Sequence, residues 1–120
     1  MTIDANKALV RRYIDEVWHG GQSAEPFLGP GYRRYLTPGA APLTAAEQQE
    51  RIKGFRVAFP DLRFTVEALI AEADRVAFQC TLRGTHRGRL GAHPPTGRGM
   101  TIGLIDIVRI SEGRFVEHWG

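Results

Sequence analysis

The chain has 120 residues, of which 42% are hydrophobic and 24% are charged, and its formal net charge is +3. A chain of this length forms one domain and buries roughly two-thirds of its unfolded surface, so it needs no structural metal or disulfide. The arginines are scattered, without a basic helix, a finger motif or a basic–aromatic alternation, which argues against a nucleic-acid-binding protein.

The sequence also excludes several other classes of protein. No stretch approaches the roughly 20 apolar residues of a membrane span, and the N-terminus lacks the basic and apolar segments of a signal peptide. The single cysteine, Cys80, excludes an internal disulfide, which fits a reducing compartment. The histidines have no metal-ligand spacing, and no glycine-rich phosphate loop follows a strand. We expect a soluble cytoplasmic protein that binds no metal and no nucleotide.

The first predicted helix covers residues 6–18, where apolar residues recur at helical spacing on one face. Asp4 is a suitable N-cap, and Gly20-Gly21 is a natural end. The following segment, residues 29–42, is rich in glycine and proline and is predicted to be a loop that contains one short strand near residues 32–36.

The second predicted helix begins after Thr44. Thr44 and Glu47 have the spacing of a capping box, in which each side chain accepts a hydrogen bond from the other residue's backbone N–H. Pro60 ends the helix, so we place its last residue near Ala58.

After Pro60 the period of the apolar pattern changes from 3.6 to 2, which indicates long half-buried strands. Antiparallel strands are predicted over residues 62–70, 75–86, 100–110 and 115–120. Helices followed by such strands make an α+β domain, which covers residues 1–120.

The last hairpin combines two ionisable residues with an apolar face. A three-residue turn over residues 111–113 would place Asp106 directly opposite His118, with both side chains in an apolar row on one face. The opposite face would carry Phe115 and Trp119, an apolar patch that suggests a homodimer.

Two interpretations of Asp106 and His118 remain open at this point. In one, the two side chains form a structural pair, because a carboxylate on an apolar wall requires a hydrogen-bonding partner. In the other, they form an acid/base pair at the floor of a pocket, where desolvation would raise the pKa of the carboxyl group.

Five segments, in this order, resemble the SnoaL-like polyketide cyclase (ester cyclase) family. They are Asn6 to Tyr13, Ala58 to Leu62, Gly84 to Gly88, Pro94 to Arg98 and Glu117 to Trp119. The resemblance implies a cone-shaped fold of the nuclear-transport-factor-2-like superfamily, with a curved antiparallel sheet packed on N-terminal helices around a pocket. It also implies ring closure on a polyketide-type intermediate, a hydrophobic small molecule, without a cofactor.

The chain departs from the family prototype at the catalytic position. The prototype's acid/base aspartate corresponds to Gly120, its last-strand histidine to His118, and a second pocket histidine to Asp106. A third pocket histidine of many relatives corresponds to Tyr35. We therefore assign catalysis to Asp106 with His118. Relatives usually continue beyond the last strand, so the chain is either naturally short or truncated at the C-terminus.

The remaining expected substrate contacts come from several parts of the chain. They are Tyr13, Trp18, Tyr35, Phe59, Gln79, His86 and Leu104. Three functions remain open: a cyclase or isomerase, a non-catalytic small-molecule binding protein of the same fold, and, ranked lower, chemistry like that of an epoxide hydrolase or ketosteroid isomerase. The missing aspartate at Gly120 favours the second, because one fold hosts many functions.

Overall fold

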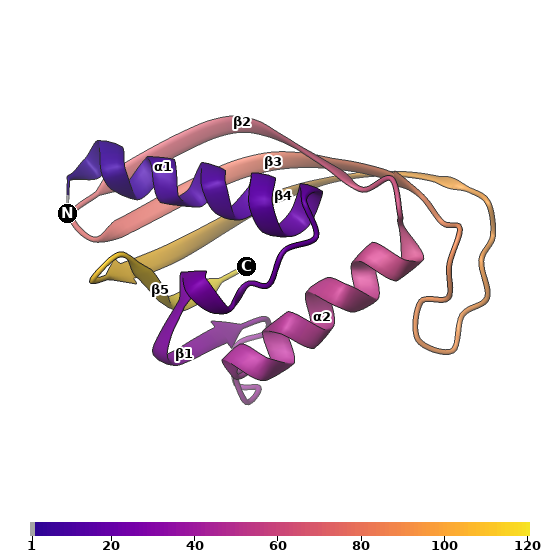
Figure 1. Ribbon diagram of the computed structural model, residues 1–120, viewed down its shortest axis with the longest axis horizontal. Helices are drawn as coiled ribbons and strands as arrows, with labels where there is room; N and C mark the ends of the chain where they lie inside the picture. Colours follow the sequence, from indigo (N-terminus) through magenta and orange to yellow (C-terminus); the bar gives the residue numbers. More distant parts are fainter. Residues whose placement is uncertain (1) are drawn as a thin grey trace.

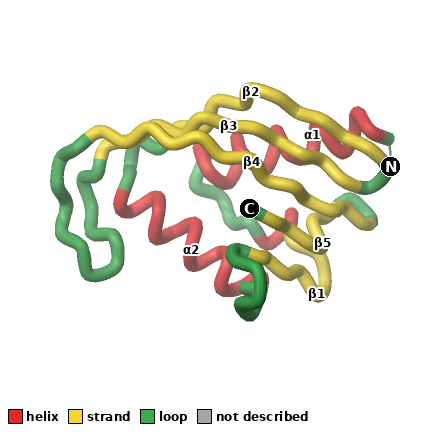
Figure 2. Tube along the Cα trace, turned by 180° about the vertical axis from the view of Figure 1, so that it is seen from behind, coloured by secondary structure: helices red, strands yellow, loops and turns green. Residues whose placement is uncertain are grey.

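The computed structural model describes residues 2–120, which form two helices and a curved five-stranded sheet (Figure 1). The helices are α1 (Ile3–Tyr13) and α2 (Ala45–Ala58), and the strands are β1 (Leu28–Tyr35), β2 (Arg63–Glu72), β3 (Arg75–Thr85), β4 (Gly99–Ser111) and β5 (Arg114–Trp119). Helix α1 packs against β2 and β3, whereas α2 packs against β1. Figure 2 shows the molecule from the back of the first view, with the strands in front of α1. Helix α1 therefore covers the concave face of the sheet.

Helix α1 begins one turn earlier than the sequence indicated. The N-cap is Thr2 and not Asp4, because the Thr2 hydroxyl accepts a hydrogen bond of 3.0 Å from the backbone N–H of Ala5. After Tyr13 the helix continues as a wider π-helical segment, Ile14–His19, whose apolar side chains are buried. Within residues 2–120, no helix is both long and apolar enough to cross a membrane.

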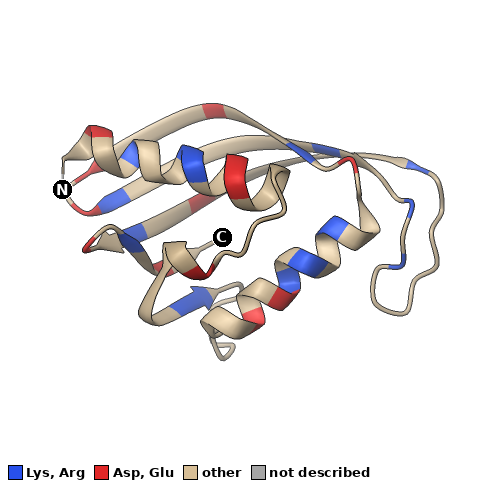
Figure 3. Cartoon of the chain, in the orientation of Figure 1, with Lys and Arg blue, Asp and Glu red and all other residues tan. Residues whose placement is uncertain are grey.

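The capping box of α2 is confirmed. The Thr44 hydroxyl accepts a hydrogen bond of 3.2 Å from the Glu47 backbone N–H, and the Glu47 carboxylate accepts one of 3.0 Å from the backbone N–H of Thr44. The helix ends at Ala58, close to Pro60, as expected. Lysines and arginines are spread over both helices, the sheet and the loop of residues 86–98 (Figure 3).

The sheet is mixed, and its strand order is β1-β5-β4-β3-β2. The expected curved sheet on N-terminal helices is present, and three of its four strand pairs are antiparallel, whereas β1 pairs in parallel with β5. The sequence hides the beginning of β1, since Gly29, Pro30 and Gly31 are typical of a loop. In the structure this strand aligns Tyr32 and Arg34 beside the last strand, on the concave side of the sheet.

The turn between β4 and β5 differs from the predicted one. Ser111 pairs with Arg114, so the loop consists of Glu112 and Gly113 alone. One further residue, Val116, forms a bulge, since Ile110 pairs with Phe115 and the next pair joins Arg109 to Glu117. Val108, and not Asp106, therefore lies directly opposite His118. The bulge also turns Phe115 into the core, where its side chain is completely buried, which corrects its predicted position on the outer face.

Replacing Glu112 by asparagine should raise the free energy of unfolding by about 0.5–1 kcal/mol. Both loop residues have positive φ, 51° for Glu112 and 75° for Gly113, and Asn-Gly is the preferred sequence for such a turn. Urea unfolding measures the change, with Glu112→Ala as the control that keeps the strain. Equal stability of the two variants would contradict the prediction.

Candidate active site

A cavity of about 180 Å³ lies between the helices and the concave face of the sheet. A dry cavity of about 150 Å³ holds benzene, so this space admits a small aromatic or polycarbonyl compound. Most of its wall is apolar, with side chains that include Trp18, Phe55, Phe59, Phe64, Phe78 and Leu104. The polar part of the wall is formed by Arg34, Arg51, Asp106 and His118, and Tyr13 also lines the cavity.

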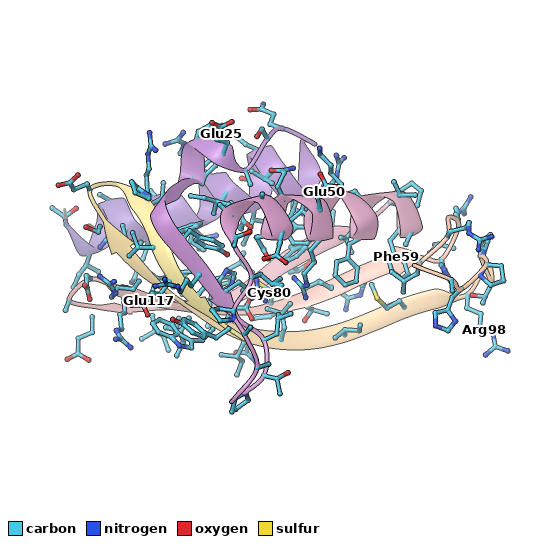
Figure 4. The ribbon with its side chains drawn as sticks, turned by 90° about the horizontal axis from the view of Figure 1, so that it is seen from below. Glu25, Glu50, Phe59, Cys80, Arg98 and Glu117 are labelled. Carbon is cyan, nitrogen blue, oxygen red and sulfur yellow. The ribbon has the colours of Figure 1, made fainter. Side chains whose placement is uncertain are left out.

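Six of the residues expected at the site line this cavity. They are Tyr13, Trp18, Phe59, Leu104, Asp106 and His118. Phe59 lies near the end of the sheet from which the loop of residues 86–98 emerges (Figure 4). The two ionisable residues and part of the aromatic wall thus line the same cavity.

Three of the expected substrate contacts do not line the cavity. Tyr35 stacks on Trp119 on the outer face of the sheet, with ring centroids 5.9 Å apart. Gln79 is exposed on that face because its neighbours on β3 point inward. His86 follows the end of β3, and its Nδ1 is 3.1 Å from the hydroxyl of Thr96. Its ring packs against Phe59, with centroids 5.5 Å apart, so it touches the wall of the cavity from outside.

The side chains of Asp106 and His118 are in contact despite the changed register. The bulge keeps both on the concave face, where they are diagonal neighbours, and the His118 Nε2 atom lies 3.0 Å from Asp106 Oδ2. Asp106 is 7% exposed and His118 is 2% exposed. The pair is therefore shielded from bulk water, which strengthens its hydrogen bond.

The contacts of His118 define which ring nitrogen carries the proton. The Arg34 Nη1 atom and the Tyr32 hydroxyl each lie 3.2 Å from His118 Nδ1. A guanidinium has no acceptor, so Nδ1 must present its lone pair. The proton of the neutral ring is therefore on Nε2, from which it is donated to the Asp106 carboxylate.

The pKa of His118 agrees with a neutral ring. Burial lowers it from 6.5 to about 4, and the positive charge of Arg34 adds to this effect, whereas the hydrogen bond to Asp106 acts in the opposite direction. At neutral pH the imidazole is thus an uncharged hydrogen-bond donor to a carboxylate.

Arg34 is the functional-site residue that the sequence analysis missed most clearly. Its guanidinium is 5% exposed, its Nη2 lies 3.7 Å from Asp106 Oδ2, and the same nitrogen donates to the backbone oxygen of Gly120 at 2.5 Å. Its sequence neighbours resemble an exposed loop. The usable signal was the alternation in residues 32–36, which puts Tyr32 and Arg34 on one face of a strand.

The structure gives a steric reason for glycine at position 120. A Cβ atom there would overlap the Asp106 carboxylate and would lie 2.9 Å from the backbone oxygen of Ile105. The φ angle of Gly120, +122°, also disfavours a side chain. The Asp106 carboxylate thus occupies the space in which a side chain at position 120 would begin.

The cavity has no features of a metal site. Within the described part of the chain, no group of three or more histidine, cysteine, aspartate or glutamate side chains is arranged to hold a metal ion. Among residues 2–120, Asp106 is the only carboxylate on the cavity wall, and it already contacts Arg34 and His118. The arrangement of Asp106 with Arg34 and His118 suits proton transfer between the Asp106 carboxyl group and an organic ligand.

The pH dependence of stability should report the buried neutral histidine. Because the pKa of His118 is lower in the folded protein than in the unfolded chain, its contribution is present above pH 6.5 and is lost as pH falls towards 4. Between pH 7 and pH 4.5 we expect wild type to lose on the order of 2 kcal/mol more than His118→Gln, which keeps a donor for Asp106. Urea unfolding at both pH values measures this difference, and identical losses would contradict the assignment.

Comparison with known proteins places the chain in a family of known structure. A family model for SnoaL-like polyketide cyclases matches residues 8–120. Among solved structures, AclR from Streptomyces galilaeus is 28% identical with a TM-score of 0.88, covering 98% of this chain and 88% of AclR. IdmH from Streptomyces antibioticus is 26% identical with a TM-score of 0.80, covering 95% of this chain and 88% of IdmH. TsrD from Streptomyces laurentii is 25% identical with a TM-score of 0.84, covering 99% and 88%. A search of curated proteins gave no significant match.

Proposed function

The chain belongs to the SnoaL-like polyketide cyclase family, and on that premise we propose that it is a cofactor-independent cyclase or isomerase of a polyketide-like or other hydrophobic carbonyl compound. The observation that carries the proposal is the Asp106 carboxylate, which lines a largely apolar cavity and accepts a hydrogen bond from neutral His118. A carboxylate held in this way is suited to removing a proton from a C–H group next to a carbonyl.

In the proposed mechanism Asp106 acts first as base and then as acid. It takes the proton of an acidic C–H group, and the resulting enolate carbon attacks a second carbonyl group of the same molecule. The new alkoxide then recovers the proton from the Asp106 carboxyl group, so the enzyme returns to its starting state. His118 serves as a positioning residue, because its Nε2–H donates a hydrogen bond to Asp106 Oδ2 and so holds the orientation of the carboxylate in the cavity wall.

The apolar wall supports this chemistry in two ways. It excludes water from the enolate, and it folds a flexible substrate so that its two reacting carbons meet. Tyr13 also lines the cavity. Burial raises the pKa of Tyr13, so its side chain stays a neutral phenol that can donate a hydrogen bond to a substrate carbonyl.

Hydrogen exchange of a simple carbonyl compound tests the proton transfer without knowledge of the natural substrate. Methyl benzoylacetate carries an acidic methylene between two carbonyl groups, and NMR in D₂O follows the loss of its signal. We expect the protein to accelerate this exchange with saturation at high probe concentration. A bound probe whose exchange proceeds at the buffer rate would contradict catalysis.

The second candidate is a non-catalytic binding protein of the same fold. The observation that favours it is Gly120, which stands where the family prototype has its catalytic aspartate. Binding of methyl benzoylacetate without accelerated exchange is the result that this candidate predicts. Chemistry like that of an epoxide hydrolase or a ketosteroid isomerase ranks lower; epoxide opening needs a second acid, and Asp106 is the only carboxylate on the wall of this cavity among the described residues.

A homodimer, formed through the outer face of the sheet, is part of the proposal. Paired residues of all five strands form a row there: Ile70, Ala77, Ile107, Trp119 and Tyr35. Ile70 is 67% exposed, and the adjacent Ile105 is 66% exposed, so a second copy would cover a substantial apolar surface. We expect sedimentation equilibrium to give a dimer and Ile105→Glu to give a monomer; a monomeric wild type would contradict this.

A cytoplasmic location is also proposed, supported by the free buried Cys80.

A further inference from the structure

Arg51 is a cationic residue of the cavity that the proposed proton transfer does not use. It lies on α2, lines the cavity, and is only partly exposed. It shares the polar end of the cavity with Arg34, Asp106 and His118, because α2 packs against β1, the strand that carries Arg34. The charges of Arg34 and Asp106 both act on it. The aromatic ring of Phe55, 5.0 Å from its Cζ atom, supports the side chain from its own helix.

This guanidinium lacks an anionic partner in residues 2–120. It forms no ion pair there, since no carboxylate oxygen lies within 4.0 Å of its nitrogens. The two acidic residues nearest in the helix sequence have other partners, because Glu47 accepts from the Thr44 backbone and Glu50 pairs with Lys53. Burial and the positive charge of Arg34 both lower the pKa of Arg51. An opposite charge beside this group would therefore stabilise it.

The other charges of the polar end compensate each other. Arg34 lies 3.7 Å from Asp106, and His118 is neutral, so these three side chains carry no net charge. Arg51 therefore leaves one positive charge on the wall. The Nε atom of Arg34 is a second donor at this end, buried and without a hydrogen-bond acceptor among the described residues. Both features suit a ligand that brings an anionic oxygen.

We propose that the substrate carries a carboxylate, which pairs with Arg51 while the apolar part of the molecule fills the aromatic part of the cavity. This inference rests on the proposed function only for the location of the site. It names the substrate class more closely: a carbonyl compound with a free acid group, rather than its neutral ester or amide. A guanidinium recognises a carboxylate through two parallel N–H···O bonds, which also fixes the orientation of the ligand.

Binding of a matched acid and amide tests this inference. Cinnamate and cinnamamide have nearly the same shape and differ in charge, and NMR titration gives the dissociation constant of each. We expect wild type to bind cinnamate at least about tenfold more tightly than cinnamamide. In Arg51→Met this ratio should fall to about one with little change in cinnamamide affinity, and Arg51→Lys should keep part of it.

Lys53→Met is the matched control, because it removes one positive charge from the exposed side of the same helix. Its acid-to-amide ratio should equal that of wild type. Equal affinities in wild type, a preference that survives in Arg51→Met, or no detectable binding of cinnamate at about 10 mM would each overturn the proposal.

Asp106→Asn separates this inference from the proposed function. The variant removes the carboxylate that would transfer the proton but leaves Arg51 in place. It should therefore lose hydrogen exchange of methyl benzoylacetate while it keeps the preference for cinnamate. Retained exchange would contradict only the proposed role of Asp106. A preference for cinnamate that is lost in Arg51→Met but not in Lys53→Met would still support the anion site.

Discussion

Replacing Asp106 by asparagine is expected to slow protein-catalysed hydrogen exchange of methyl benzoylacetate by about 10²–10⁴-fold. Asparagine has nearly the size of aspartate, and its amide oxygen still accepts the hydrogen bond from His118 Nε2–H. It cannot take up a proton from carbon, so the variant removes the proposed base and keeps the local packing. NMR in D₂O with saturating probe measures the rate constant.

The control for this experiment is Glu117→Gln. Glu117 lies on β5 and pairs with Arg109 at 2.6 Å, away from the cavity, so neutralising it changes the charge of the same hairpin without touching the site. Its exchange rate should stay within about twofold of wild type. An Asp106→Asn protein that is folded by circular dichroism and exchanges the probe at the wild-type rate would exclude Asp106 as the base.

The last hairpin illustrates how far the sequence determines this site. Alternation along β4 correctly predicts that Asp106 faces the core, because residues two apart on a strand share a face. The register could not be predicted from the pattern, since a two-residue turn plus a bulge at Val116 shifts the pairing by two residues relative to a three-residue turn, and a shift of two leaves His118 on the same face. The error moved Phe115 to the wrong face. The predicted and the observed register both place His118 on the same face as Asp106. The ionisable pair was therefore predicted despite the wrong turn.

The residues around that pair depend on contacts that sequence patterns do not contain. Tyr32 and Arg34 reach His118 because β1 pairs in parallel with β5, some 80 residues later in the chain. Arg51 reaches the same end of the cavity from a helix. Helical spacing with Ile52 and Phe55 indicates only that it flanks a buried face. The packing of α2 against β1 determines which residues lie near Arg51 in space.

Asp106 and Gly120 are sterically linked. A residue with a Cβ atom at position 120 would overlap the Asp106 carboxylate, so the two positions cannot both carry an acid in this backbone arrangement. In the proposed function, Asp106 on the neighbouring strand supplies the carboxyl group that the family prototype carries at the position of Gly120. Proton transfer requires the position of the oxygen atoms and not the strand from which they come. Glycine at position 120 is therefore compatible with the proposed catalysis by Asp106.

The largest effect on stability is expected for Arg34→Met, which should lower the free energy of unfolding by about 3–5 kcal/mol. Methionine fills much of the volume but leaves the Asp106 carboxylate buried without its cationic partner and the Gly120 oxygen without its donor. The Nδ1 atom of His118 also loses one of its two donors. Urea unfolding at pH 7 measures the loss, and a loss below about 1 kcal/mol would show that Arg34 does not compensate the buried charge.

The double variant Arg34→Met/Asp106→Asn distinguishes charge compensation from lost packing. If the uncompensated carboxylate causes the instability, removing its charge should recover about 2 kcal/mol or more relative to Arg34→Met alone. If the loss comes from packing around the guanidinium, the two effects should add, because asparagine restores no contact. Arg34 compensates the charge of Asp106 in the first case, which leaves the charge of Arg51 available for a ligand. In the second case Asp106 could itself neutralise Arg51, and the preference of the cavity for an anion would need another source.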